Sequence, residues 1–164
     1  MKYAITGHTQ GVGSGLFKRL SPNAIGFSLT TGYDINNKED RTRIIQEAMT
    51  SDVFINNAPC GFAQTYLFLE LFSAWKDDPN KTIINVGSRI AELERLPHSH
   101  AHLAEYQAEK LILKEMSNRM PNSLCKINYR WFAYVGTEKI RTKYPHFTPA
   151  DYITIDQAVD IILS

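Results

Sequence analysis

The chain has 164 residues, of which 18 are Lys or Arg and 17 are Asp or Glu, and its formal net charge is +1. Hydrophobic residues make up 43% and charged residues 21%, which excludes a wholly disordered chain, and the near-zero charge indicates neither a nucleic-acid partner nor a membrane surface. Two cysteines, no leader-like segment and no long apolar run favour a single domain over residues 1–164 in the reducing cytoplasm.

Short apolar runs that predict strands alternate along the chain with longer segments at helical spacing. In chain order the sequence predicts a strand at 3–6, a helix at 12–20, a strand at 24–29, a helix at 38–49, a strand at 53–55, a helix at 62–75, a strand at 82–86, a helix at 102–119, a strand within 125–133 and a closing helix at 155–163. This alternation predicts an α/β fold with a Rossmann-like, doubly wound parallel sheet whose faces are both covered by helices.

The connection after the second predicted strand is too short for this fold. Only three residues separate Leu29 from the strand-like run Tyr33-Asp34-Ile35, whereas a parallel crossover needs about a dozen residues. We therefore expect one crossover unit to be missing, about five strands to remain, and no ordered helix to lie between Leu29 and Asp34.

A glycine-rich segment, Thr6-Gly7-His8-Thr9-Gln10-Gly11-Val12-Gly13, joins the first predicted strand to the first predicted helix. Glycine permits a tight turn and a close approach of the backbone to a pyrophosphate, and the helix start supplies free N–H groups. This context favours a dinucleotide site over a merely flexible turn. The expected cofactor-binding residues of this segment are Gly7, Thr9, Gln10, Gly11, Val12 and Gly13.

The residues that end the second strand of such a fold meet the adenosine ribose. Here they are Ser28-Leu29-Thr30-Thr31, with no carboxylate for a 2′-hydroxyl and no Arg for a 2′-phosphate. Three hydroxyl groups favour NADP(H) over NAD(H), with Ser28 as one contact. Asp34 either bonds the adenine amino group or caps the helix that begins near Lys38.

Four motifs in this order resemble those of the short-chain dehydrogenase/reductase family. The loop matches Thr-Gly-x-x-x-Gly-x-Gly, Asn56-Asn57-Ala58 is similar to Asn-Asn-Ala-Gly, Ser88 stands where the family's catalytic serine follows a strand, and Tyr106 with Lys110 matches Tyr-x-x-x-Lys. The resemblance covers nearly the whole chain. It implies an NAD(P)(H) cofactor, contacted also by Asn56, Ala58, Tyr106, Lys110 and Thr137.

The chain also departs from the family pattern. It is far shorter than most members, no residue matches the family's catalytic asparagine, and Pro59 replaces a glycine. Thr137 is kept without the Pro-Gly that usually precedes it. These departures leave the placement of nicotinamide and the proton relay open.

The chemistry rests on three side chains. Tyr106 and Lys110 are four apart on a predicted helix and share one face, so an ammonium beside the phenol would lower the pKa of Tyr106 from about 10. Tyr106 would then serve as general acid in carbonyl reduction or as general base in alcohol oxidation, and Ser88 would stabilise the substrate oxygen. The alternative is a chance pair on a helix surface.

Two further groups of residues stand out in the sequence. His98, His100 and His102 are assigned to a solvated loop, and no metal is expected. Aromatic and aliphatic side chains at helical spacing form a packing stripe against the sheet or a partner subunit: Phe62, Tyr66, Leu69, Phe72 and Trp75. With the helix at 102–119, this stripe predicts a homodimer.

The sequence therefore predicts an oxidoreductase that transfers a hydride between NAD(P)(H) and a small-molecule carbonyl or alcohol. Ser88, Tyr106 and Lys110 are its expected catalytic residues. The loop from Thr137 to Pro149 would form a short substrate lid. The alternative function is a dinucleotide-binding sensor or assembly protein without catalysis.

Overall fold

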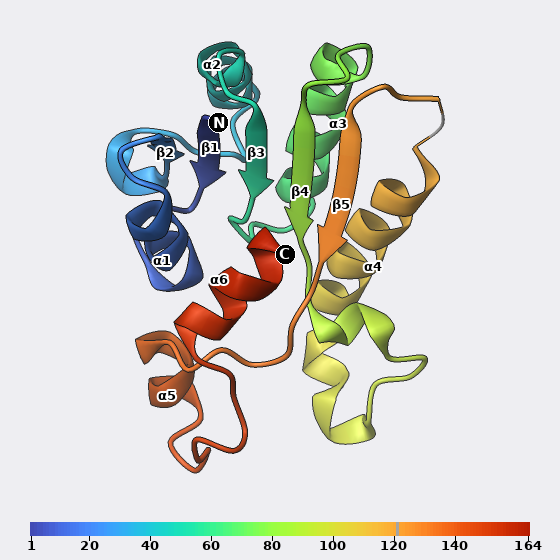
Figure 1. The fold of residues 1–164 in the computed structure, drawn as a ribbon. Helices are drawn as coiled ribbons and strands as arrows, with labels where there is room; N and C mark the ends of the chain where they lie inside the picture. The colour runs from blue at the N-terminus through green and yellow to red at the C-terminus, as the bar shows by residue number, and fades with distance from the viewer. Residues whose placement is uncertain (121) are drawn as a thin grey trace.

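The chain is described by a computed structural model that covers residues 1–120 and 122–164. In these residues one parallel sheet has the order β2-β1-β3-β4-β5, so the predicted five-stranded parallel sheet is confirmed (Figure 1). The strands are β1 (Tyr3–Thr6), β2 (Ala24–Phe27), β3 (Val53–Asn56), β4 (Thr82–Val86) and β5 (Lys126–Arg130).

Helices cover both faces of the sheet, as the doubly wound prediction requires. The helices are α1 (Gly11–Leu20), α2 (Lys38–Ala48), α3 (Ala63–Trp75), α4 (Ala104–Arg119), α5 (Glu138–Lys143) and α6 (Ile155–Leu163), with 3-10 turns η1 (Leu29–Thr31), η2 (Arg89–Glu92) and η3 (His98–Leu103). Helices α2, α3 and α4 share one core with the sheet, whereas α1 and α6 share the other.

Side-chain alternation within the strands separates these two cores. Ala4 and Phe54 face α2 and α3, whereas their chain neighbours Ile5 and Ile55 face α1 and α6. All four residues are fully buried, which explains why β1 and β3 read as continuous apolar runs.

The connection from β2 to β3 contains α2 and passes over β1, and β2 pairs with β1 alone. The described residues therefore hold no strand between Leu29 and Asp34, as predicted. The expected absence of any ordered helix there is wrong, because η1 forms one turn. Ser28 and Thr31 close that turn through a reciprocal capping box, and Gly32 ends it with φ +86°.

Arg41 ties this shortened connection to the rest of the fold. Its guanidinium contacts Glu70 of α3 through Nε at 2.9 Å and Nη2 at 3.0 Å, and Nη1 donates to the carbonyl of Ile35 at 2.9 Å. Only 7% of Arg41 is exposed. A cation buried this deeply needs an ion pair and hydrogen bonds to offset its lost hydration, and Arg41 has both.

The aromatic stripe predicted on the third helix is only partly correct. Leu67, Phe68, Leu71 and Trp75 are fully buried against the sheet, but Tyr66 is 54% exposed. The buried set has i, i+4 and i+8 spacing, so the sheet selects a face of α3 rotated away from Tyr66. Residues 62, 69 and 72 lie at the border of that face.

The segment expected to be a lid loop contains the short helix α5, which sequence patterning missed. Thr137 is the N-cap of α5, and its hydroxyl accepts a hydrogen bond from the amide of Ile140 at 3.3 Å. Across the described ranges, the structure contains no helix long and apolar enough to cross a membrane.

Candidate active site

The loops that carry the motifs gather at one edge of the sheet, where the strands reach their carboxyl ends (lower edge in Figure 1). Parallel strands bring these ends together, and α/β folds bind ligands in the crevice outside them. Pairing of β3 with β1 and with β4 therefore places the glycine loop, the Asn57-Ala58 turn and Ser88 on one side of the molecule.

The glycine loop is fastened to the turn after β3. The buried hydroxyl of Thr6 accepts hydrogen bonds from the amides of Asn57 at 2.9 Å and Ala58 at 3.1 Å. The Asn57 side chain returns a bond to the Thr6 carbonyl at 3.1 Å. Gly7 adopts φ +71°, and a Cβ there would lie 3.2 Å from Ala58, so this contact needs glycine.

The start of α1 forms a cradle that only glycine leaves open. A Cβ at Gly13 would lie 1.9 Å from the Gly7 carbonyl oxygen, and one at Gly11 would lie 3.3 Å from Thr137. No side chain caps this helix within the described residues, and its first turn holds no acidic group. Its first N–H groups therefore remain available to an anion, as a pyrophosphate requires.

His8 lies within this loop and was not proposed as a site residue from the sequence. Its ring packs over Gly26 of β2, where a Cβ would approach to 2.2 Å, and lies 4.9 Å from the ring of Phe17. The buried Nδ1 has no hydrogen-bond partner among the described residues. The sequence feature that could have indicated this packing is Gly26 in the second strand, because a glycine there leaves room for the imidazole of His8.

The hydroxyl groups after β2 come together with the glycine loop. Thr30 Oγ1 lies 2.9 Å from Ser28 Oγ and donates to Thr9 Oγ1 at 3.2 Å. Asp34 accepts a hydrogen bond from the Asn36 amide at 2.9 Å. The alternative that Asp34 caps the following helix is wrong, because Asn37 caps α2.

Ser88 and Tyr106 meet near the end of β4. Ser88 is the N-cap of η2, and its hydroxyl accepts a hydrogen bond from the Ile90 amide at 3.4 Å. Tyr106 stands in the first turn of α4 and is 36% exposed. Burial raises the pKa of Tyr106, the Ser88 side chain lowers it, and the charge of Glu109 raises it.

Lys110 is 4% exposed, and its Nζ lies 5.5 Å from the centre of the Tyr106 ring. Burial lowers the pKa of Lys110 to about 8, and the charge of Glu109 acts in the opposite direction. The expectation that this ammonium lowers the pKa of Tyr106 is wrong, since desolvation dominates at the phenol. The ammonium instead donates to Gln64 Oε1 at 2.6 Å.

Asn56 does not face the site. It is fully buried, and its Nδ2 donates to the Gln64 carbonyl and to Asn85 Oδ1, each at 2.9 Å. The side chain therefore cannot contact a cofactor, which corrects the expectation, and the reason is the parallel register that sets Asn56 beside Asn85. Gln64, which sequence patterning missed, lies in the same interior network.

Tyr129 lies beneath Ser88. A Cβ at Gly87 would lie 2.0 Å from its hydroxyl, so only glycine precedes Ser88 without displacing the ring. Burial raises the pKa of Tyr129 to about 12. The hydroxyl has no hydrogen-bond partner in the described part of the chain.

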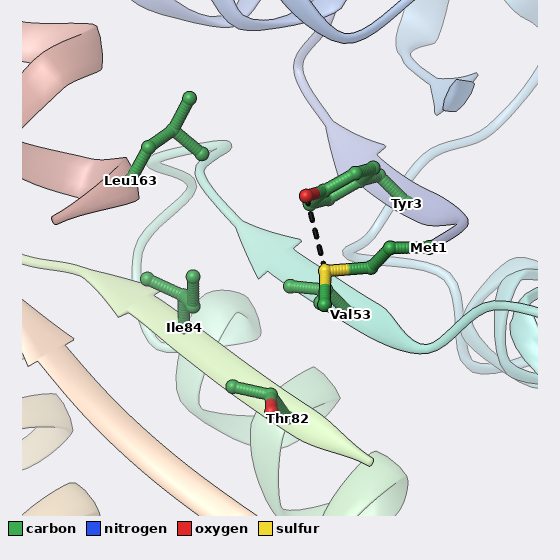
Figure 2. Close-up of a pocket in the computed structure, with 6 residues that line it drawn as sticks. All are labelled: Met1, Tyr3, Val53, Thr82, Ile84 and Leu163. Atoms are coloured by element: carbon green, nitrogen blue, oxygen red, sulfur yellow. Dashed lines mark hydrogen bonds between the residues drawn. The ribbon is translucent and has the colours of Figure 1, made fainter. Parts of the chain in front are cut away.

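A hollow of about 240 Å³ lies elsewhere, on the face covered by α1 and α6 (Figure 2). Its walls include Tyr3, Val53 and Thr82, which are the first residues of their strands, together with Met1, Ile84 and Leu163. The Tyr3 hydroxyl is directed at the Met1 sulfur at 3.1 Å. Its place at the amino ends of the strands separates it from the candidate active site.

The three histidines expected in a loop form η3 instead, and the rings of His100 and His102 stack at 6.3 Å. Over residues 1–120 and 122–164, no three His, Cys, Asp or Glu side chains are grouped to hold a metal ion.

No family model matches the chain, and no curated protein matches it. Solved structures do. A short chain dehydrogenase from Burkholderia cenocepacia in complex with NADP is 22% identical with a TM-score of 0.76, and the match covers 99% of this chain and 84% of that one.

Two other solved structures have a similar fold. The 3-alpha-hydroxysteroid dehydrogenase of a Pseudomonas species, complexed with NADH, is 16% identical with a TM-score of 0.77. A serine dehydrogenase complexed with NADP+ is 15% identical with a TM-score of 0.75. Each match covers 99% of this chain and 88% of the other. The chain thus has the fold of the short-chain dehydrogenases, as the resemblance implied.

Proposed function

We propose that the protein is an NAD(P)(H)-dependent oxidoreductase that reduces a carbonyl or oxidises an alcohol. The observation that carries the proposal is the pairing of two sites at one sheet edge. The glycine cradle of Gly7, Gly11 and Gly13 fits a pyrophosphate, and Ser88 and Tyr106 meet at the end of β4 with Lys110 beneath. The dinucleotide complexes among the structural neighbours support it.

The cofactor would be held chiefly by backbone. The N–H groups at the start of α1 would bind the pyrophosphate, with Thr9, Gln10 and Val12 beside them and Thr137 closing against Gly11. Ala58, in the turn after β3, would line the other side of the cofactor site. A bound nicotinamide supplies or accepts the hydride.

The protein's own groups would handle the proton and the developing charge. The Ser88 hydroxyl donates to the substrate oxygen, and the Tyr106 phenol delivers the proton in reduction or accepts it in oxidation. Burial raises the pKa of Tyr106, so the phenol would be the proton donor in reduction. Lys110 places a positive charge beneath the ring.

A titration with NAD(H) and NADP(H), followed by nicotinamide fluorescence, tests the proposal. We expect binding of at least one cofactor, and crystals soaked with both should show nicotinamide ordered beside Tyr106. Failure of both cofactors to bind overturns the proposed function.

We also propose that NADP(H) binds more tightly than NAD(H). The hydroxyls of Ser28, Thr30 and Thr9 form a connected group at the end of β2, and no carboxylate stands among them to repel a 2′-phosphate. Tighter binding of NAD(H) in the same titration would refute this preference.

We further propose a homodimer built on α3 and α4. Four large hydrophobic side chains are exposed on these helices: Tyr66 at 54%, Leu111 and Ile112 at 42%, and Tyr106 at 36%. Burying such a patch favours association. Sedimentation at micromolar concentration should show a dimer that Ile112→Glu dissociates. Leu124→Glu, at a site 61% exposed outside both helices, is the control, and a monomeric parent would contradict the proposal.

A further inference from the structure

Gln64 lies in the first turn of α3, and its side chain contacts Lys110 of the candidate active site. It is 2% exposed, and it meets the 4% exposed Lys110 across 46 residues of sequence. The distance from Lys110 Nζ to Gln64 Oε1 is 2.6 Å, within the range of a charge-assisted hydrogen bond. No other acceptor bonds this ammonium within the described residues.

The orientation of the Gln64 amide is fixed by its surroundings. Nε2 donates to the Asn56 carbonyl at 2.8 Å and to the Val86 carbonyl at 3.0 Å. Both partners are acceptors, so only the NH₂ end of the amide can face them. The carbonyl end must therefore face Lys110. Asn56 and Val86 are the last residues of β3 and β4, so the amide bridges two strand ends at the candidate active site.

We propose that Gln64 is the positioning residue for Lys110: its amide is clamped by two main-chain carbonyls and holds the lysine ammonium beneath the Tyr106 ring. The inference rests on the proposed function only for what Lys110 does there. A buried ammonium without an acceptor would lose its hydrogen bond and its place, because water cannot replace the amide in a closed interior.

The charged and titratable groups around Lys110 are few. Glu109, on the same helix, favours the ammonium, while burial disfavours it. Tyr106 presents its ring at 5.5 Å, and α3 contributes the neutral amide of Gln64. Changing Gln64 therefore alters one interaction of the ammonium while leaving Glu109 and Tyr106 in place.

Two substitutions should both lower the pH at which Lys110 titrates. Gln64→Met removes the acceptor, so the ammonium is less stable and the midpoint falls below the parental value. Gln64→Leu also lacks an acceptor and has a similar volume, so it should lower the midpoint in the same way. Carbon NMR of ¹³C-labelled lysine follows the Lys110 side chain, with the Lys110→Arg spectrum giving the assignment.

Gln107 offers a matched control. Its Nε2 also donates to two main-chain carbonyls, those of Ile90 at 3.2 Å and Leu93 at 3.0 Å, but no bond joins it to Lys110. Gln107→Met should leave the Lys110 midpoint unchanged. We expect Gln64→Met to weaken cofactor binding about tenfold through a misplaced Lys110.

Unchanged Lys110 midpoints in both Gln64 variants would overturn the inference, as would an equal shift in Gln107→Met. If Gln64→Met does not fold, Gln64→Leu decides alone by a downward shift or its absence. If the parental protein binds no cofactor but the Gln64 variants still lower the Lys110 midpoint, the proposed function is refuted and the positioning role of Gln64 stands.

Discussion

A single methyl group at Gly13 tests the geometry of the cofactor cradle. In Gly13→Ala the new Cβ would lie 1.9 Å from the Gly7 carbonyl oxygen, whereas real Cβ atoms keep at least 3.0 Å. The obstacle is backbone, which cannot rotate aside as a side chain does. The loop must therefore move by about 1 Å relative to α1.

The magnitude follows from two opposing terms. Overpacking of this kind costs about 1–3 kcal/mol, and replacing glycine by alanine within a helix returns about 1 kcal/mol. The unfolding free energy should then fall by no more than about 2 kcal/mol. The N–H groups that would meet the pyrophosphate are displaced, so we expect cofactor affinity to fall tenfold or more, on the order of one charge-assisted hydrogen bond.

Gly15→Ala provides the matched control in the same helix. Its Cβ would lie 2.5 Å from Ile155 Cγ2, so the change strains the contact of α1 with α6 and not the loop. Urea unfolding and cofactor titration separate the two effects. Gly15→Ala should change stability while its affinity stays within about twofold of the parent. Equal affinity losses in both variants, or none in Gly13→Ala, would refute the reasoning.

Three other perturbations have defined outcomes. Tyr106→Phe removes the proton donor and keeps the ring, so turnover of a carbonyl substrate, followed by nicotinamide absorbance, should fall about 10²- to 10⁴-fold with unchanged cofactor affinity. Because burial lowers the pKa of Lys110 to about 8 from about 10.4 in the unfolded chain, the folded state binds fewer protons between these values. The unfolding free energy should therefore rise between about pH 8 and pH 10, by at most about 1.4 kcal/mol per pH unit, and Lys110→Met should remove that rise. Arg41→Met leaves Glu70 without its partner in a partly buried site and should lower the unfolding free energy, measured in urea, by about 3 kcal/mol.

Each of these has a result that would contradict it. Parental turnover in Tyr106→Phe would reduce the Tyr106–Lys110 pair to a feature of the helix surface. A stability that is flat between pH 8 and pH 10 would show that burial does not lower the pKa of Lys110 in the folded state. A change below about 1 kcal/mol in Arg41→Met would mean that the ion pair with Glu70 is solvated.

The sequence by itself determined the order of strands and helices, the place of the glycine loop and the shortened connection after β2. These follow from local causes. Apolar periodicity sets the type of each element, glycine fixes the turn before α1, and three residues are too few for a crossover. The spacing of Tyr106 and Lys110 likewise fixed their common helix face.

The tertiary structure decided what those residues meet. Whether Lys110 faces Tyr106 alone or also Gln64 depends on how α3 packs against α4, and no local pattern encodes that. Asn56 turned inward because the register of β3 with β4 sets it beside Asn85. Likewise, the sheet chose the buried face of α3 and left Tyr66 exposed. Contacts between residues far apart in the chain arise only after the strands pair, and that is why the amide that holds Lys110 could not be found from the sequence.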